Sequence, residues 1–249
     1  MPADDLTVCV LLYGADDYCF RMAQRVLNQQ FKALGAVTRD VRFGLNAVGD
    51  ATRNLLAQAV SDYFPDAVVI DCPENIHKYP MMRRLLYEKP LQSRLTMWFD
   101  DDSCIAENTD VEVWLTRIRQ QMRAYTMLGS VHKDRFVGKQ AEWIKAQPWY
   151  NGKEPSAYTQ FAAGGWWVVQ TDALRIFDWP PQALKHRGGD IMLGELLRQH
   201  DLPLGHFRDG VWINANEHGV ESQSTRRGVV EAPVGVDYEK VLCNSESAA

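Results

Sequence analysis

Three aspartates in a row stand at the point where a run of apolar residues ends. The stretch MWFDDDSC covers residues 97–104, and Asp100, Asp101 and Asp102 would all be ionised at neutral pH in an ordinary environment. Like charges so close repel one another unless a positive group lies among them. A divalent cation meets that need, because one or two carboxylates together with substrate phosphates often hold Mg²⁺. Acidic runs are also common in solvated loops, so the structural context decides between the two interpretations.

The first hundred residues supply that context. Apolar runs predict strands at 6–14, 41–47, 66–72 and 95–99, and amphipathic runs predict helices at 18–31, 51–64 and 78–89. Asp16 or Asp17 would cap the first of these helices, and Asp50 the second. This alternation predicts an α/β fold with right-handed crossovers, built on a single Rossmann-like mixed sheet flanked by helices.

The predicted fold places the polar strand ends together. Ligands of open α/β sheets bind beyond the carboxyl ends of the strands. The strand at 95–99 therefore delivers Asp100–Asp102 to the same rim as Tyr13, Gly14 and Asn46. Because the aspartates follow a buried strand, a metal-bound nucleotide is favoured over a solvated loop.

Beyond residue 103 the pattern loosens. We expect a helix at 111–125, with Trp114, Ile118 and Met122 facing inward, a strand at 127–133, and a helix that runs into a loop at 141–158. Glycine pairs then precede ordered elements at 161–177 and 188–207, and the tail NSESAA is expected to be disordered. No change in composition marks a linker.

Composition sets broad limits on the class of protein. The chain has 249 residues, 46% of them hydrophobic and 24% charged, which is ordinary for a soluble globular protein. No apolar run approaches the roughly 20 residues that span a bilayer. The five cysteines show no CxxC spacing and the amino-terminal residues lack signal-peptide features, so we expect a reducing cytoplasm and no membrane contact. The net charge of −5 argues against a nucleic-acid binder, although residues 78–94 form a basic run.

Other phosphate-binding and hydrolytic motifs are missing from the sequence. It contains no GxxxxGK[ST] loop and no GxGxxG after a strand, and it lacks HExxH and GxSxG. A nucleotidyltransferase, which would be expected to carry a glycine-rich loop near its start, has only Gly14 there. A non-catalytic carbohydrate- or nucleic-acid-binding module would fit the eight tryptophans but has no need of three clustered aspartates.

Three stretches, in this order, resemble the motifs of GT-A fold glycosyltransferases. WFDDDS (98–103) looks like their DxD motif, AAGGWWVV (162–169) is similar to their acceptor-side segment, and GGDIMLGELLRQHDLPL (188–204) resembles their acidic motif before a helix containing Leu-Gly. The resemblance covers about residues 6–220. It implies an inverting hexosyltransferase that uses Mn²⁺ or Mg²⁺ and moves a sugar from a nucleoside diphosphate, such as a UDP-sugar, to an acceptor hydroxyl.

The resemblance also implies roles for individual residues. Asp100 and Asp101 would contact the ribose and nucleotide, and Asp102 would bind the metal together with Asp100. Asp190 would be the catalytic base, or else simply the N-cap of the helix that it precedes, and Glu195 is the next candidate base. The late histidine ligand of such enzymes would be His218, with His206 as its rival; either could equally be an ordinary hydrogen-bonded histidine.

Further residues are expected on the donor and acceptor sides. Lys78 and Arg83 would face the diphosphate if they reach the rim, while Tyr13, Gly14 and Asn46 would contact the nucleotide. Asn46 and Asp50 could read the base, and service as a helix cap alone is the equal alternative for Asp50. The expected acceptor-binding residues are Gly164, Gly165, Trp166 and Gly189. Trp166 and Trp167 point to opposite faces of a strand, so one would be core and the other a platform for an acceptor ring.

The domain organisation follows from the same resemblance. We expect a single GT-A domain over 1–243, with a nucleotide-sugar-binding half at about 6–103, an acceptor-side half at about 104–220 and a carboxyl-terminal extension and tail at about 221–249.

A narrower resemblance concerns the acceptor. VRFGLNAVGDATR, KYPMMRR, MWFDDDS, GGWWV, GGDIMLGELLR and HFRDGVWIN together look like the glycosyltransferases associated with phage TET-type dioxygenases, which modify 5-hydroxymethylcytosine in DNA. It implies a bacterial or phage-infected cytoplasm and a set of basic residues that grip phosphates: Arg83, Arg84, Lys133, Arg135, Lys139, Arg226 and Arg227. A cell-surface glycan or a protein is the alternative acceptor.

Overall fold

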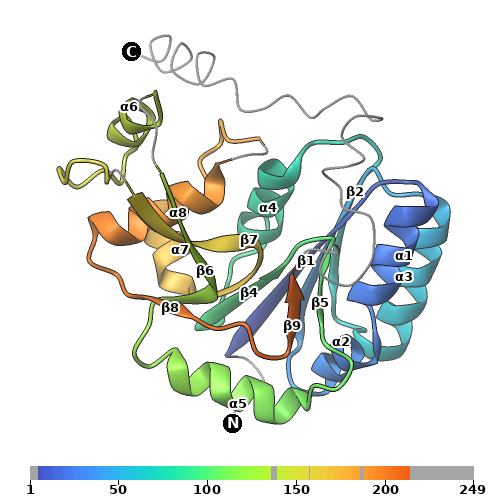
Figure 1. Cartoon of the computed structure of the whole chain (residues 1–249). Coiled ribbons are helices and arrows are strands. Elements are labelled where there is room, and N and C mark those ends of the chain that lie inside the picture. Colours follow the sequence, from blue (N-terminus) through green and yellow to red (C-terminus); the bar gives the residue numbers. More distant parts are fainter. Residues whose placement is uncertain (1–4, 136–138, 157, 186–187, 214–249) are drawn as a thin grey trace.

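The computed structural model describes residues 5–135, 139–156, 158–185 and 188–213 (Figure 1). The first half contains β1 (Leu6–Tyr13), α1 (Asp17–Val26), α2 (Gln29–Ala33), the short helix η1 (Leu34–Ala36), β2 (Asp40–Asn46), α3 (Asp50–Tyr63), β3 (Val68–Cys72), α4 (Lys78–Tyr87) and β4 (Leu95–Phe99). The second half contains β5 (Ser103–Ile105), α5 (Val111–Gln121), β6 (Met127–Arg135), α6 (Lys139–Lys145), β7 (Tyr158–Gln170), α7 (Thr171–Phe177), α8 (Gly189–Gln199), β8 (Leu204–His206) and β9 (Val211–Ile213).

One mixed sheet organises these elements. Its strand order is β3-β2-β1-β4-β7-β6-β8, and β5 pairs with β9 in a separate small sheet. The first four strands in this order are parallel, whereas β7 runs antiparallel to both β4 and β6. The predicted α/β fold with a single mixed sheet is confirmed.

Helices cover both faces of the sheet. Along β1, Val8, Val10 and Leu12 pack into a core with α1, α2, α3 and α5, whereas Cys9 and Leu11 pack on the other face with α4, α7 and α8. The alternation follows from the two-residue period of a strand, and burial on both faces explains why the strand is apolar throughout. Figure 1 shows α1 and α3 beside the parallel strands, and α7 and α8 beside β6 and β7.

Local capping differs from the sequence-based expectation at two helices. The helix predicted over 18–31 is divided into α1 and α2, because the Asn28 side chain accepts a hydrogen bond from Phe31 N at 2.9 Å and caps a new helix. Of the two predicted caps, Asp16 is the one that caps α1, accepting from Cys19 N at 2.9 Å, and Asp17 is the first residue of the helix. Asp50 does not cap α3: Gly49 precedes the helix, and Asp50 lies in its first turn, where it pairs with Arg53.

Among the described residues, no helix combines the length and the apolar character needed to cross a membrane.

Candidate active site

The turn after β4 gathers the three aspartates. Asp100 N donates to Gly165 O at 2.7 Å, which extends the pairing of β4 with β7, and Ser103 N donates to Asp100 O at 3.1 Å, which closes the turn. Asp100, Asp101 and Asp102 each offer a carboxylate oxygen, and these oxygens lie within 4.8 Å of one another. The buried strand therefore delivers the carboxylates to the rim, as the sequence predicts.

Lys78 is a positive group among these carboxylates. It is the first residue of α4, and its Nζ lies 2.5 Å from Asp100 Oδ2 and donates to Gly164 O at 3.0 Å. The side chains of Lys78 and Asp100 are only 11% and 15% exposed, so their attraction is weakly screened. Burial raises the pKa of Asp100 to about 6, even though Lys78 acts to lower it. Burial acts to lower the pKa of Lys78, but the charges of Asp100 and Asp190 outweigh it and raise that pKa.

One carboxylate oxygen of Asp100 has no hydrogen-bond partner in the described part of the chain. Asp100 Oδ1 is buried, and no described residue forms a hydrogen bond with it. Leaving a buried carboxylate oxygen unsatisfied is costly. Carboxylate oxygens suit Mg²⁺ and Mn²⁺, so the Asp100–Asp102 turn fits a divalent cation.

Two histidines, His218 and His206, were candidates for a further metal ligand, and the structure describes only His206. His218 lies outside the described residues. His206 is not in the cluster of candidate ligand atoms, and its Nδ1 accepts a hydrogen bond from Val131 N at 3.1 Å. In the structure His206 is therefore an ordinary hydrogen-bonded histidine, and it is not one of the clustered candidate metal ligands.

Asp190 lies close to Lys78. Asp190 Oδ1 accepts from the Tyr79 hydroxyl at 3.1 Å, and Asp190 Oδ2 accepts from Gly164 N at 3.2 Å. A Cβ atom on Gly164 would stand 2.9 Å from Lys78 Nζ and 3.2 Å from Asp190 Oδ2, so both side chains lie against this glycine. Gly188 is the N-cap of α8, and no side chain of the described residues caps this helix. The alternative interpretation of Asp190 as an N-cap is therefore wrong.

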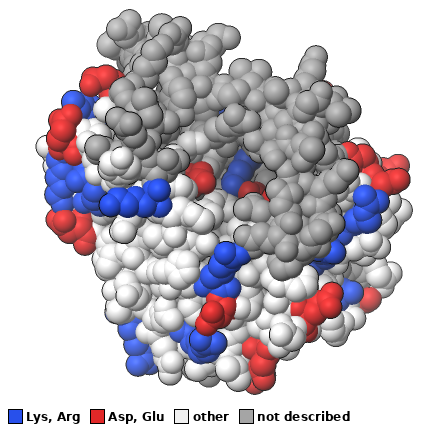
Figure 2. Space-filling view, viewed as in Figure 1, with Lys and Arg blue, Asp and Glu red and all other residues white. Residues whose placement is uncertain are grey.

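An irregularity of β7 positions Gly164. In the β6–β7 pairing, Trp167 faces Gly129 whereas Ala162 faces Val131, so β7 carries extra residues at 163–166. This bulge turns the Gly164 backbone toward α4 and α8, where it contacts both Lys78 and Asp190. Figure 2 shows acidic and basic side chains close together in the upper part of the face that it draws.

The tryptophan pair does not provide an acceptor platform. Trp166 and Trp167 belong to the cores on opposite faces of the sheet, as the strand period predicts. Both are buried: Trp166 packs against Trp114 and Phe207, and Trp167 stacks on Trp98 with ring centroids 6.1 Å apart. The expectation that one of them offers a free ring face is wrong, because helices cover both faces of β7.

The polar residues at the ends of β1 and β2 organise the segment before α4. Asn46 is 2% exposed; its Oδ1 accepts from Ile76 N at 2.9 Å, and its Nδ2 donates to Asn75 Oδ1 at 3.0 Å. Asn75 Nδ2 in turn donates to the Tyr13 hydroxyl at 3.4 Å, and Gly14 N donates to Asn46 O at 3.3 Å. Asn46 therefore holds the loop that presents Lys78. The expectation that its side chain reads a base is corrected to this positioning role.

Arg83 and Lys78 have separate environments, although both come from α4. Arg83 donates to the carbonyl oxygens of Asp178 and Pro180, pairs with the Asp178 carboxylate at 3.0 Å, and lies over the Tyr87 ring. The prediction that Arg83 faces a diphosphate is wrong, since its guanidinium holds the loop after α7.

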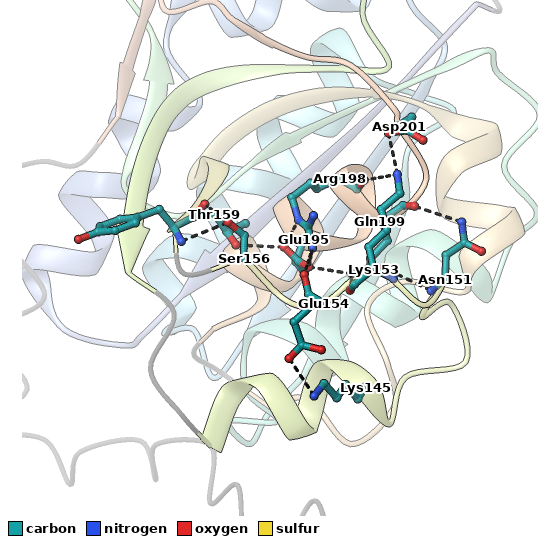
Figure 3. Close-up of polar contacts among 11 residues, drawn as sticks. Lys145, Asn151, Lys153, Glu154, Ser156, Thr159, Glu195, Arg198, Gln199 and Asp201 are labelled. Carbon is teal, nitrogen blue, oxygen red and sulfur yellow. Dashed lines mark hydrogen bonds and ion pairs between the residues drawn. The ribbon is translucent and has the colours of Figure 1, made fainter.

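Glu195 is part of a structural network in the same helix as Asp190. Its fully buried carboxylate accepts from Arg198 at 2.6 and 2.9 Å, from Thr159 at 3.1 Å and from Gln199 at 2.9 Å (Figure 3). Gln199 and Arg198 also bind the backbone of residues 153 and 154. A carboxylate saturated by four donors has no free site for an acceptor proton, so Glu195 is not the alternative base.

Sequence reasoning missed Tyr79. Its hydroxyl is the side-chain donor to Asp190, and its ring fills the space left by Gly189: a Cβ there would lie 2.2 Å from Tyr79 Cζ. The Gly188–Gly189 pair was a signal that something bulky packs against the start of α8, but nothing in the sequence identified the neighbour.

Comparisons with known proteins place the fold. No protein-family model and no curated protein sequence matches the chain. A mannosyltransferase from Pyrobaculum calidifontis, solved with GDP-Man and Mn²⁺, is similar in structure with a TM-score of 0.56 and 11% identity, over 98% of this chain and 76% of that chain. TarS residues 1–349 from S. aureus give a TM-score of 0.51 and 14% identity, over 82% of this chain and 58% of that chain.

A third solved structure, the 4-diphosphocytidyl-2C-methyl-D-erythritol synthase from Anaerococcus prevotii, is similar over 92% of this chain and 95% of that chain, with a TM-score of 0.49 and 10% identity. At identities this low, likeness shows the fold alone. The mannosyltransferase and TarS comparisons establish that the mixed sheet with its flanking helices is a GT-A-type α/β fold.

Proposed function

We propose that the chain is a metal-dependent glycosyltransferase that moves a sugar from a nucleoside-diphosphate donor to an acceptor hydroxyl with inversion. One observation carries the proposal: the acidic Asp100–Asp102 turn lies at the end of β4, and a separate carboxylate, Asp190, is held beside it against Gly164. The GT-A-type fold supports the same reading.

The reaction uses the two carboxylate groups for different tasks. An oxygen lone pair of the acceptor hydroxyl forms a bond to the anomeric carbon of the sugar, while the bond from that carbon to the diphosphate oxygen breaks. The bonding electrons leave with the nucleoside diphosphate. The hydroxyl proton passes to the Asp190 carboxylate, a step that contributes about 10²–10⁴-fold as general base catalysis.

The acidic turn would serve the donor. Asp100 and Asp102 would hold a divalent cation, with Asp100 Oδ1 as the unpartnered oxygen available to it. When bound, such a cation supplies Lewis-acid stabilisation of the leaving diphosphate. Lys78 adds a positive charge beside the same carboxylates, and Asp101, Tyr13 and Gly14 would contact the nucleotide.

The acceptor is proposed from the narrower resemblance as 5-hydroxymethylcytosine in DNA, with a UDP-sugar as donor. Of the residues expected to grip phosphates, Arg83 is bound to Asp178 and Arg84 pairs with Glu88. Basic and acidic side chains are interspersed among the described residues on the face in Figure 2. This distribution favours a second candidate acceptor, the hydroxyl of an uncharged glycan.

Nucleotide binding tests the proposed metal role directly. We expect calorimetry to show UDP or GDP binding that needs Mn²⁺, and Asp102→Asn to weaken it by at least about tenfold, the scale on which residues around a metal matter. Asp172→Asn is the matched control, since Asp172 lies exposed in the first turn of α7 and pairs only with Arg175 among described residues. Equal nucleotide affinity in EDTA and in Mn²⁺, or equal affinity of Asp102→Asn and wild type, would contradict the metal site.

A further inference from the structure

Tyr79 contacts the proposed base from a rigid position. Its side chain is 1% exposed, and its hydroxyl reaches Asp190 Oδ1 at 3.1 Å. The Trp179 ring packs edge-on against the Tyr79 ring with centroids 5.9 Å apart, and Tyr79 N donates to Lys185 O at 3.0 Å. Because Gly189 has no Cβ, the start of α8 closes directly onto the tyrosine ring.

The hydroxyl of Tyr79 remains a donor over the working pH range. Burial, together with the charges of Asp190 and Asp100, raises the pKa of Tyr79 well above its ordinary value. The hydroxyl is therefore protonated at neutral and moderately alkaline pH, and a carboxylate can only accept from it.

Two donors from different elements then fix the two oxygens of Asp190. Tyr79 in α4 donates to Oδ1, and the backbone N–H of Gly164 in β7 donates to Oδ2. Among the described residues one donor binds each oxygen, so the carboxylate plane cannot turn about its side-chain torsion without breaking a hydrogen bond. Catalytic groups need such support, because a misplacement of about 1 Å can cost about 10²-fold in rate.

We infer that Tyr79 is a positioning residue that, with Gly164 N, holds the Asp190 carboxylate in the orientation in which it accepts the proton of the acceptor hydroxyl. This inference rests on the proposed function. Tyr79 itself gives up no proton in the reaction; it acts through Asp190 and contacts neither donor nor acceptor. Its removal should therefore change turnover and leave donor binding alone.

The chain provides a closely matched control in the same helix. Tyr87 is a second largely buried tyrosine of α4, and its hydroxyl donates to Leu174 O at 2.9 Å and to Trp179 O at 2.6 Å, away from Asp190. Tyr79→Phe and Tyr87→Phe both remove one hydroxyl from the helix. The single hydroxyl hydrogen of Tyr87 is shared between two carbonyl oxygens, so Tyr87→Phe should lower the melting temperature at least as much, yet only Tyr79→Phe frees the Asp190 carboxylate.

The experiment measures kcat, KM for each substrate and nucleotide affinity for both variants. Thermal unfolding gives the folded fraction of each variant, and kcat is expressed per folded molecule. We expect Tyr79→Phe to lower kcat by about tenfold or more, with substrate KM and nucleotide affinity within about twofold of wild type. Tyr87→Phe should keep the wild-type kcat. In an Asp190→Asn background, Tyr79→Phe should cause no further loss, because the carboxylate that it positions is gone.

Each other outcome counts against the inference. If Asp190→Asn is impaired but Tyr79→Phe behaves like Tyr87→Phe, the positioning role is refuted while the proposed function stands. A full additional loss in the Asp190→Asn background also refutes it, since Tyr79 would then act on something else. If wild type transfers no sugar, or Asp190→Asn keeps the wild-type rate, the proposed function fails and the positioning role fails with it.

Discussion

Replacing Asp190 with Asn separates the chemistry of this residue from its contribution to the fold. The change removes the negative charge and the ability to accept a proton, but it preserves size and shape. Asn can keep both local contacts: its amide oxygen can accept from Gly164 N, and its amide NH₂ can donate to the Tyr79 hydroxyl oxygen, which is also an acceptor. Gly188, and not Asp190, occupies the N-cap of α8, so no cap is lost.

The expected magnitudes follow from this geometry. With both hydrogen bonds retained in neutral form, the free energy of unfolding should change by no more than about 1 kcal/mol, the net worth of one hydrogen bond. Turnover should fall by at least about 10²-fold, the usual scale for losing a general base, which corresponds to about 2.7 kcal/mol of transition-state stabilisation. Nucleotide affinity should stay close to wild type, because Asp190 is not among the candidate metal ligands.

The assay combines urea unfolding, calorimetry with UDP or GDP and Mn²⁺, and turnover with saturating donor. Asp172→Asn is again the control: it is the same substitution in the first turn of the neighbouring helix α7, near the opposite end of β4 from Asp100. The proposed role of Asp190 as the base is refuted if Asp190→Asn turns over at the wild-type rate, or if its lost turnover is matched by lost folded protein.

Two further predictions concern buried charges that lie outside the site. Arg42 is buried and donates to both oxygens of Asp40, at 2.9 Å each, and to the backbone carbonyls of residues 85, 89 and 90. Arg42→Met should lower the free energy of unfolding in urea by about 3 kcal/mol. This is the lower end of the range for breaking a buried ion pair, because 24% of the Asp40 side chain is exposed and water can still reach it. Burial acts to raise the pKa of Asp40, but the hydrogen bonds from Arg42 and Thr7 lower it overall, so this stabilisation is present above the ordinary carboxyl pKa of about 4 and is lost as the pH falls below it. A wild-type acid-unfolding curve that coincides with that of Arg42→Met would contradict the assignment. Glu195→Gln places an amide NH₂ group, itself a donor, where four donors already point. The free energy of unfolding should therefore fall by about 2 kcal/mol, while kcat per folded molecule is unchanged. A loss of kcat per folded molecule would make Glu195 a candidate base again.

The parts of the site that local pattern determines were predictable from the sequence. The apolar run at 95–99 predicts a buried strand, and the parallel arrangement places Asp100, Tyr13 and Asn46 at one rim. Helical periodicity could have gone further. Lys78 and Arg83 are five residues apart in α4, which sets them about 140° apart around the helix, so both could not face the rim. The same spacing separates Asp190 from Glu195 in α8.

The remaining features depend on contacts between segments that lie far apart in the chain. Strand period predicts that Trp166 and Trp167 point to opposite faces, but only the packing of α5 on one side and α7 and α8 on the other shows that both faces are covered. The bulge at 163–166 and the closure of Gly189 onto Tyr79 likewise arise from long-range packing. No local signal in the sequence specifies which residue hydrogen-bonds to Asp190.

The central claim, sugar transfer dependent on the acidic turn and Asp190, is tested most directly by mass spectrometry of acceptors. Hydroxymethylated duplex DNA and a panel of neutral glycans are incubated with mixed UDP- and GDP-sugars and Mn²⁺, using wild type, Asp102→Asn, Asp190→Asn and Asp172→Asn. The account predicts that wild type and Asp172→Asn add the mass of one hexose to one acceptor class, and that excess EDTA, Asp102→Asn and Asp190→Asn each abolish or greatly reduce the product. Transfer that continues undiminished in EDTA and in both site variants, or the absence of any hexose adduct with wild type, would contradict it.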